Sequence, residues 1–326
     1  MTQHRSAARK ILLDCDPGVD DALAIAYAVG SPDIDLVGIT TVAGNVSLGK
    51  TTSNALRVLE FLGAGDVPVT AGSAVPLLRV PVTAEQVHGT DGLRGARLPA
   101  ASTGPRPGYA TDFIIDTVRA APGEITLVAT GPLTNIALAL RREPDLAGSV
   151  RDFVIMGGSS GRGNITPAAE FNIAVDPEAA AIVFSAGWTV TMVGLDVTLQ
   201  ATADAAVIGR IGGLGRLATE LVLPCLLSSA DGDDAGAATE SAHNPLHGPE
   251  VHDVCAVAHV ARPDLLGCEP AHVVVETTGR WTSGMTVTEF RSAPQTRNAL
   301  VATTINVRAF WDSVLDTYTA LAATLP

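Results

Sequence analysis

Short apolar runs alternate with segments of helical periodicity along most of the 326-residue chain. This alternation is typical of β-α units, in which each buried strand is followed by a helix that returns across a parallel sheet. The runs expected to form strands are 10–15, 34–42, 124–130, 151–156, 189–195 and 298–307. The segments expected to form helices are 20–29, 47–62, 132–142, 176–186 and 308–324. The pattern predicts an α/β fold, Rossmann-like, with a mostly parallel central sheet flanked by helices.

No Pro-, Gly- or Ser-rich linker and no block of charge divides the chain. We therefore expect a single domain over 10–326, preceded by a flexible N-terminal extension over 1–9. Two segments resist assignment: 72–110, which is rich in Gly and Pro, and 228–250, which is polar and has no aromatic residue. Loops of this length are usually functional or mobile. We expect 228–250 to be a mobile lid that orders over a bound ligand.

The charge balance limits the partners of this chain. Its formal net charge is −13, and it has only two lysines, Lys10 and Lys50. Such a surface repels phosphate backbones and anionic lipids, so we expect no binding to nucleic acid or membranes. A hydrophobic content of 47% with 17% charged residues is enough for a large core. These features favour an enzyme or binding protein for a small neutral or cationic ligand.

Cysteine spacing and the N-terminus indicate the compartment. The four cysteines, at 15, 225, 255 and 268, are far apart and form no CxxC pair, which favours reduced thiols over a disulfide framework. The start, MTQHRSAARK, is polar with no apolar segment behind it, and no stretch reaches the roughly 18 uninterrupted apolar residues of a membrane span. We expect a cytoplasmic protein.

Four aspartates, Asp14, Asp16, Asp20 and Asp21, follow directly on the first apolar run, in the segment ILLDCDPGVDDALAIA. A turn after this strand places them at the carboxyl edge of the sheet, where α/β folds build their sites. Neighbouring carboxylates raise one another's pKa unless a cation lies among them, and the segment contains no Lys or Arg. A bound metal ion resolves the repulsion; oxygen ligands alone indicate Ca²⁺ or Mg²⁺, and sites with bidentate carboxylates and backbone carbonyls favour Ca²⁺. The alternative is that Asp20 and Asp21 only cap the following helix.

The same segment resembles the N-terminal signature of the inosine-uridine-preferring nucleoside hydrolases, a family that cleaves the N-glycosidic bond of ribonucleosides. Further stretches match the family in the same order, from about residue 10 to the C-terminus. They are TTVAGN at 40–45, HGTDGL at 88–93, TGPLTNIA at 130–137, GNITPAAEFNIAVDPEAA at 163–180, LDVT at 195–198, VHDVCAVA at 251–258 and GMTVTEF at 284–290. The resemblance implies a ribonucleoside hydrolase that acts in nucleoside salvage or catabolism and assembles as a homodimer or homotetramer.

A Ca²⁺ site is part of what the resemblance implies. Its protein ligands would be the carboxylates of Asp16, Asp21 and Asp253 and the backbone carbonyl of Thr130. Asp16 is also the expected general base, because it would touch both the metal and the attacking water, whose pKa the metal lowers. Asp14 is expected to orient the turn through hydrogen bonds.

The resemblance also implies a set of polar contacts to the ribose. The expected pairs are Asp20 with Asn172 at the 2′-hydroxyl, Asp253 with Asn164 at the 3′-hydroxyl, and Glu170 with Asn164 at the 5′-hydroxyl, with Asn45 near the ribose. Both ring hydroxyls would also bind Ca²⁺. A site that binds a hydroxyl through buried polar groups rejects analogues without it, so 2′-deoxyribonucleosides should be poor substrates.

The leaving base needs a proton or a group that stabilises its negative charge. His252, beside Asp253 at the start of a helix, is the expected donor, because the pKa range of histidine suits proton transfer. His88 is the second candidate in the pocket, and His243 and His247 lie in the polar segment 228–250. Because that segment has no aromatic residue to pack on a base, the preferred nucleobase stays open.

Two other functions remain open at this stage. An Asp-x-Asp motif after a first strand also resembles haloacid-dehalogenase-type phosphatases, with Thr40 after the second strand and DGDDAG at 231–236 as an acidic motif. The other alternative is an inactive Ca²⁺-dependent protein that binds ribose or nucleosides. The stretch GGSSGRG at 157–163 is no phosphate-binding loop, because it lacks the lysine and the spacing of the known motifs.

Overall fold

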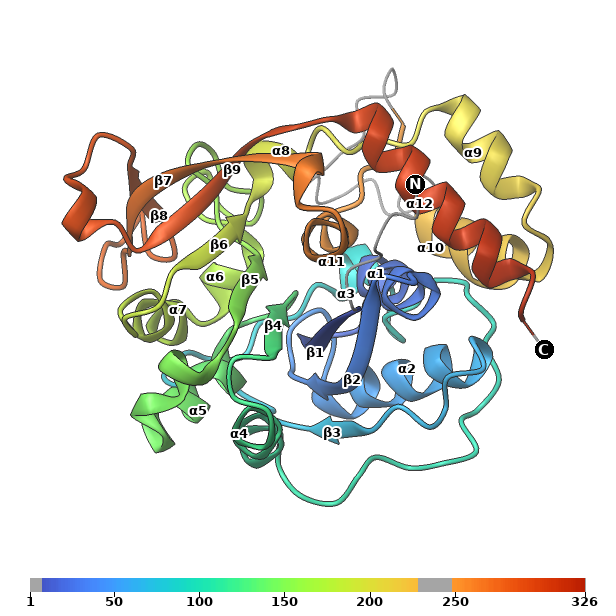
Figure 1. The fold of residues 1–326 in the computed structure, drawn as a ribbon, viewed down its shortest axis with the longest axis horizontal. Coiled ribbons are helices and arrows are strands. Elements are labelled where there is room, and N and C mark those ends of the chain that lie inside the picture. The colour runs from blue at the N-terminus through green and yellow to red at the C-terminus, as the bar shows by residue number, and fades with distance from the viewer. Residues whose placement is uncertain (1–7, 228–247, 326) are drawn as a thin grey trace, which may run out of the picture.

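A mixed nine-stranded sheet forms the centre of the computed structural model, which describes residues 8–227 and 248–325 (Figure 1). The strands in chain order are β1 (Arg9–Cys15), β2 (Ile34–Thr41), β3 (Val69–Ala71), β4 (Ile125–Ala129), β5 (Asp152–Met156), β6 (Val190–Val193), β7 (Leu266–Val275), β8 (Thr286–Glu289) and β9 (Ala299–Ile305). Their order across the sheet is β3-β2-β1-β4-β5-β6-β9-β7-β8. All pairs from β3 to β9 are parallel, and β7 pairs antiparallel with both β9 and β8.

Helices cover both faces of this sheet. They are α1 (Val19–Gly30), α2 (Leu48–Phe61), α3 (Glu85–His88), α4 (Ala110–Ala120), α5 (Thr134–Arg142), α6 (Phe171–Val175), α7 (Pro177–Phe184), α8 (Leu195–Thr198), α9 (Ala205–Gly212), α10 (Leu223–Leu227), α11 (Asp253–Ala261) and α12 (Val307–Ala322). One hydrophobic core lies between the sheet and α1, α2, α11 and α12, and a second lies between the sheet and α4, α5 and α7. The strands between them are buried on both faces, which explains their continuous apolar runs.

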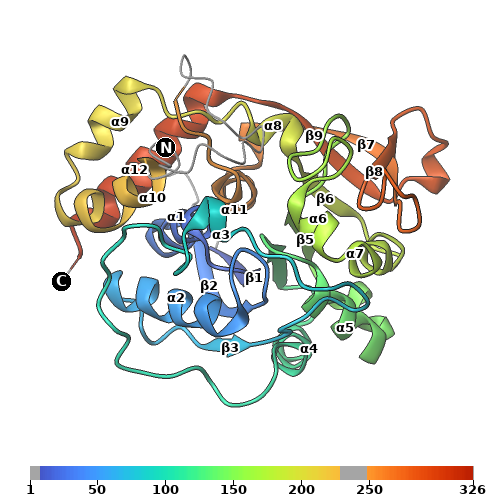
Figure 2. The same ribbon diagram turned by 180° about the vertical axis from the view of Figure 1, so that it is seen from behind.

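The chain reverses its direction of winding at β1. It proceeds from β1 to β2 and β3 on one side, and then returns to place β4, β5 and β6 on the other side. Such a switch point opens a crevice at the carboxyl ends of the two central strands. Seen from behind, α3 lies beside α1 and α11 at this end of β1 (Figure 2). The fold therefore brings these three helices, from distant parts of the sequence, to one edge of the sheet.

The sequence predicted the parallel part of this architecture. Each predicted strand and helix is present, with ends that shift by a few residues, so the α/β fold with a single domain and a mostly parallel sheet is confirmed. The prediction of strand up to residue 195 was wrong at its end, because β6 stops before Gly194 and α8 begins at Leu195. No prediction covered β3, α4 or the antiparallel strands β7 and β8.

The two segments predicted to be mobile fall mostly outside the described residues. Residues 1–7, which make up most of the predicted N-terminal extension, lie outside the described part, and Arg9 already belongs to β1. Residues 228–247, which make up most of the predicted lid, also lie outside it. Within the described ranges, no helix combines the length and apolarity that crossing a bilayer requires. The four cysteines all lie within these ranges and form no disulfide bond there.

Candidate active site

A pocket opens at the carboxyl ends of β1, β4 and β5, beside α1, α3 and α11. It is lined by every residue that the sequence predicted for substrate binding, and by two further predicted site residues: Asp20, Asn45, His88, Thr130, Asn164, Glu170, Asn172, His252 and Asp253. These residues come from six separate segments of the chain. The tertiary fold therefore gathers these nine residues into one cavity, whereas the predicted metal ligands Asp16 and Asp21 are buried and do not line it.

Asp16 lies at the carboxyl end of β1 and is fully buried. Its Oδ2 accepts a hydrogen bond from the backbone N–H of Asn45 at 2.6 Å, whereas its Oδ1 has no partner among the described residues. Two glycines allow loops to approach this carboxylate: a Cβ at Gly44 would lie 2.0 Å from Oδ2, and a Cβ at Gly131 would lie 2.6 Å from Oδ1. The glycines of TTVAGN and TGPLTNIA are therefore required by the close approach of two loops to Asp16.

Four aspartates, Asp16, Asp20, Asp21 and Asp253, form a group that we call the aspartate cluster; the charges of Asp21 and Asp20 act on Asp16, which is not one of the three whose oxygens lie closest together. Oxygen atoms of Asp20, Asp21 and Asp253 all lie within 4.8 Å of one another. Asp21 also accepts hydrogen bonds from the backbone N–H of Gly18 at 3.0 Å and from Thr130 Oγ1 at 2.9 Å. The sequence predicted Asp20 as a ribose contact, and the structure also places it in the cluster.

The aspartate cluster is electrostatically uncompensated. Burial raises the pKa of Asp21 to about 7 and raises the pKa values of Asp16 and Asp253 well above the usual range, and the neighbouring aspartates add to each rise. None of the ion pairs formed within residues 8–227 and 248–325 involves a member of this cluster. The orphaned Oδ1 of Asp16 and the all-oxygen donor set fit a hard divalent cation such as Ca²⁺.

Two asparagines hold the groups around the cluster in place. Asn45 Nδ2 donates to the backbone carbonyl of Asp16 at 3.2 Å and to Asp21 Oδ2 at 3.1 Å. Asn172 Nδ2 donates to the carbonyl of Thr130 at 3.0 Å and to the carbonyl of Met156 at 3.1 Å. Since a carbonyl oxygen has two lone pairs, the Thr130 carbonyl keeps one for a metal ion. Both amide groups use their N–H donors within the protein, which leaves their oxygens as acceptors for hydroxyl groups.

Asp14 and Thr40 form a hydrogen-bonded pair near the carboxyl ends of β1 and β2. Thr40 Oγ1 donates to Asp14 Oδ1 at 2.6 Å, and Asn135 Nδ2 donates to the same oxygen at 2.8 Å. Burial raises the pKa of Asp14 to about 7. These bonds join three neighbouring segments and agree with the positioning role expected for Asp14. They also engage Thr40, which the phosphatase alternative required at its catalytic centre.

Glu170 and Asn164 line the side of the pocket formed by the loop after β5. Glu170 is the N-cap of α6 and accepts hydrogen bonds from the backbone N–H groups of Gly158 at 2.9 Å, Asn172 at 3.0 Å and Ile173 at 3.3 Å. Burial nevertheless raises its pKa to about 7. Asn164 Oδ1 accepts from the N–H of Phe171 at 2.9 Å. Both side chains are therefore held in place by backbone groups of the loop.

His252 and His88 both face this pocket and have different surroundings. His252 is the residue before α11, as predicted, and its Nδ1 lies 2.9 Å from Thr198 Oγ1. His88 is buried, and its Nδ1 accepts from the backbone N–H of Val19 at 3.2 Å. Burial lowers the pKa of His88, which favours the neutral imidazole. His243 and His247, the other predicted candidates, lie outside the described residues.

The apolar wall of the pocket was not predicted. It includes Met156, Ile165, Phe171 and Leu226. Phe171 lies between Glu170 and Asn172 in the quoted stretch GNITPAAEFNIAVDPEAA, so its position was a usable signal for an aromatic side chain at the site. The lining contains no Lys or Arg among the described residues, which disfavours a phosphate group as ligand.

Comparison with known proteins shows the family to which this chain belongs. The sequence pattern of the inosine-uridine preferring nucleoside hydrolases matches residues 11–312. The chain is 45% identical over 301 residues to the non-specific ribonucleoside hydrolase RihC of Escherichia fergusonii, covering 92% of this chain and 95% of that protein. It is 44% identical over 311 residues to an inosine-uridine preferring nucleoside hydrolase of Leishmania major, covering 94% and 96% of the two chains.

A solved structure extends the likeness to three dimensions. The purine-preferring ribonucleoside hydrolase from Gardnerella vaginalis superimposes with a TM-score of 0.88 at 32% identity, covering 96% of this chain and 99% of that one. The matches cover nearly the whole of the relatives as well as nearly the whole of this chain. The phosphatase alternative is thereby overturned. The chain is an enzyme of the inosine-uridine preferring nucleoside hydrolase family.

Proposed function

We propose that this protein hydrolyses the N-glycosidic bond of ribonucleosides to give free base and ribose, in a reaction that depends on Ca²⁺. The observation that carries the proposal is the uncompensated aspartate cluster, in which Asp16 is buried with an orphaned Oδ1 and Asp20 and Asp253 line a pocket together with other polar residues. A carboxylate in this state needs either a cation or a proton donor. In the proposed reaction, the bound metal ion would be the cation and the attacking water molecule would be the proton donor.

Asp16, Asp21, Asp253 and the carbonyl of Thr130 would hold the Ca²⁺, with Asp20 close enough to contribute an oxygen. When bound, the metal supplies Lewis acidity that makes water easier to deprotonate. Asp16 would take the proton from the attacking water as general base. The Asn45 N–H bond at 2.6 Å to its Oδ2 fixes the carboxylate while Oδ1 stays available.

The ribose would lie across the lining asparagines and carboxylates. Asp20 and Asn172 would bind the 2′-hydroxyl, Asp253 and Asn164 the 3′-hydroxyl, and Glu170 with Asn164 the 5′-hydroxyl, with Asn45 close by. The oxygens that Asn45 and Asn172 leave open as acceptors support this arrangement. The cost of leaving such buried groups unpaired underlies an expected preference for ribonucleosides over 2′-deoxyribonucleosides.

His252 would give a proton to the departing base. Its Nδ1 bond to Thr198 Oγ1 orients the ring, and the side chain lines the pocket beside Asp253. His88 is the less suitable donor, because its burial favours the neutral form and its Nδ1 is already occupied by the Val19 N–H. The apolar wall with Phe171 supplies a surface on which a planar base could pack.

A substrate panel tests the proposed function. Ribose release is measured with inosine, adenosine, guanosine, uridine and cytidine, before and after chelation and Ca²⁺ return, with 2′-deoxyinosine as the control. We expect release from at least one ribonucleoside, loss on chelation, recovery with Ca²⁺ and little release from the deoxy compound. Tight ribonucleoside binding without ribose release would instead indicate the inactive binding protein.

The role of His252 has its own prediction. Replacement His252→Ala should lower hydrolysis of inosine by about 10²–10⁴-fold, the usual contribution of a general acid. It should lower hydrolysis of 4-nitrophenyl riboside far less, because that leaving group departs without a proton. Steady-state rates on the two substrates provide the measurement. Equal losses on both would show that His252 positions the ribose or Asp253.

Assembly and location complete the proposal. We propose a homodimer or homotetramer in the cytoplasm that takes part in nucleoside salvage or catabolism. The domain boundary expected at residue 10 shifts to Arg9, which belongs to β1, and the rest of the expected N-terminal extension stays a proposal, because residues 1–7 lie outside the described part. Light scattering of the purified protein measures the oligomeric state.

A further inference from the structure

The segment 72–88, which we call the strap, leads from β3 to the pocket and ends in α3. Its last part supplies four pocket-lining residues, Ala84, Gln86, Val87 and His88. In its middle part Pro76 is buried and Leu77 packs against the second core, but Leu78, Val80 and Val82 are 78%, 83% and 52% exposed. Burial of the three exposed side chains therefore contributes little to holding the strap in place. Other contacts must keep this wall of the pocket formed.

Two backbone groups tie the ends of the strap. The N–H of Ser73 donates to Asn135 Oδ1 at 2.8 Å, and the N–H of Ala84 donates to the carbonyl of Asn45 at 2.9 Å. Asn45 is the residue that also holds Asp16. The end of the strap nearest the pocket is thus attached directly to the support of the aspartate cluster.

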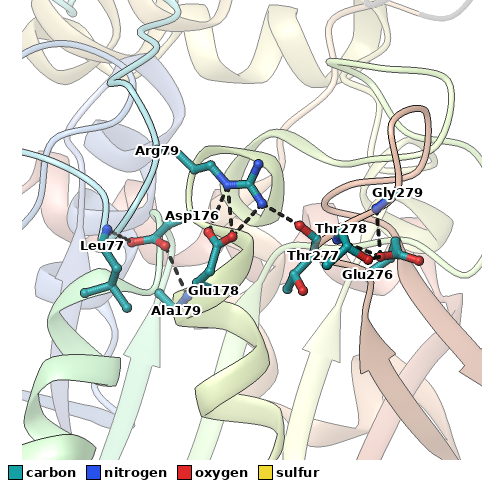
Figure 3. Close-up of polar contacts among 9 residues, drawn as sticks. All are labelled: Leu77, Arg79, Asp176, Glu178, Ala179, Glu276, Thr277, Thr278 and Gly279. Atoms are coloured by element: carbon teal, nitrogen blue, oxygen red, sulfur yellow. Dashed lines mark hydrogen bonds and ion pairs between the residues drawn. The ribbon is translucent and has the colours of Figure 1, made fainter.

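A network of hydrogen bonds and an ion pair, which we call the latch, holds the middle of the strap (Figure 3). The N–H of Leu77 donates to Asp176 Oδ2 at 2.9 Å. Arg79 Nε lies 3.0 Å from both carboxylate oxygens of Glu178, and Arg79 Nη2 donates to the carbonyl of Thr277 at 2.6 Å. One guanidinium therefore joins the strap to α7 and to the turn after β7.

The latch lies outside the pocket. Neither Arg79 nor Glu178 lines it, and their side chains are 38% and 19% exposed. An isolated ion pair at this exposure is worth little, but a planar guanidinium that also binds a backbone carbonyl fixes the geometry of three segments at once. These contacts are typical of a side chain, here Arg79, that holds other segments in position.

We propose that Arg79 and Glu178 are positioning residues that keep the strap, and with it the pocket wall at 84–88, preformed for the nucleoside. This inference rests on the proposed function. Without the latch, the wall would be formed in only a fraction of the molecules, and apparent affinity falls by that fraction. Once the nucleoside is bound, the wall is in place and the chemical step proceeds as before. Loss of the latch therefore raises KM and leaves kcat nearly unchanged.

Steady-state kinetics of Arg79→Met on the best ribonucleoside of the panel tests this proposal. We expect KM to rise by about 3- to 30-fold with kcat within about threefold of the parent, and Arg79→Lys to fall between the two. The matched control is Arg119→Met, which breaks the ion pair of Arg119 with Glu143 away from the pocket. The control should leave both constants unchanged. A fall in kcat at constant KM would overturn the proposal.

Two further measurements keep the test independent of folding and of activity. The double variant Arg79→Met/Glu178→Gln should raise KM no more than Arg79→Met alone, because both lack the same ion pair, and Glu178→Gln should raise KM less, because Arg79 keeps its bond to the Thr277 carbonyl. Amide hydrogen exchange at 84–88 should be faster in Arg79→Met than in the parent or in Arg119→Met. Unchanged exchange would overturn the latch even if no nucleoside were hydrolysed, whereas an inactive parent with faster exchange in the variant would count only against the proposed function.

Discussion

The aspartate cluster and the latch are both groups of acidic side chains near the carboxyl edge of the sheet, and they balance their charge in opposite ways. In the latch, Arg79 pairs with Glu178, and the buried Asp176 accepts hydrogen bonds from Ala179 N–H, Leu77 N–H and Thr134 Oγ1. The aspartate cluster has no such cation among the described residues, and its pKa values rise. The comparison indicates that the latch is complete by itself, whereas the cluster is built for a cation from outside.

The largest effect is expected at Asp16. Replacement Asp16→Asn should lower ribonucleoside hydrolysis by about 10²–10⁴-fold, the usual scale for a general base. In chelator, the melting temperature should stay the same or rise, because the change removes one of several repelling buried charges. Activity assays and thermal melts measure the two effects.

Asp116→Asn, on the exposed face of α4, serves as the control and should change neither quantity. Turnover of Asp16→Asn within a few-fold of the parent, at unchanged metal content, would contradict the base assignment.

In the latch, we expect a substitution to lower stability and to leave catalysis unchanged. Asp176 caps α7 and also satisfies Leu77 N–H and Thr134 Oγ1, so Asp176→Ala should lower the free energy of unfolding by about 3–4 kcal/mol. The Ca²⁺ content and kcat of this variant should equal those of the parent. Chemical denaturation measures the change.

Asp204→Ala is the matched control, since Asp204 caps α9 through Ala206 and Val207 but is exposed. It should cost only about 1 kcal/mol. Similar losses in the two variants would mean that the buried partners of Asp176 contribute nothing.

Metal loading sharpens the comparison further. Adding Ca²⁺ to chelated protein should stabilise it by about 2.7 kcal/mol at 100 times the dissociation constant. The gain should disappear in Asp253→Asn, which removes a charge from the cluster, and persist in Asp176→Ala. Thermal melts with elemental analysis provide the readout. Stoichiometric zinc in the purified protein, or full activity after exhaustive chelation, would argue against Ca²⁺.

Two of the strands that the sequence did not predict, β7 and β3, lack a clear local pattern for different reasons. β7 lies near the edge of the sheet, is only partly buried and contains Pro270, so it lacks both the continuous apolar run and the alternation of a typical strand. β3 has only three residues. Where burial on both faces is complete, as in β1 and β4, local pattern is enough, because the core dictates nearly every residue.

The sequence by itself determined the parallel sheet, the turn after β1 and the residue types of the site, because these follow from local hydrophobic period and from short motifs. Only the tertiary structure decided which groups meet. It brings Asp253 beside Asp21, joins Arg79 to Glu178 across 99 positions, and requires glycine at 44 and 131 because backbone there approaches Asp16. Contacts between distant segments depend on how helices pack on the sheet, and the free energy of that packing is spread over the whole core, so no short stretch of sequence records it.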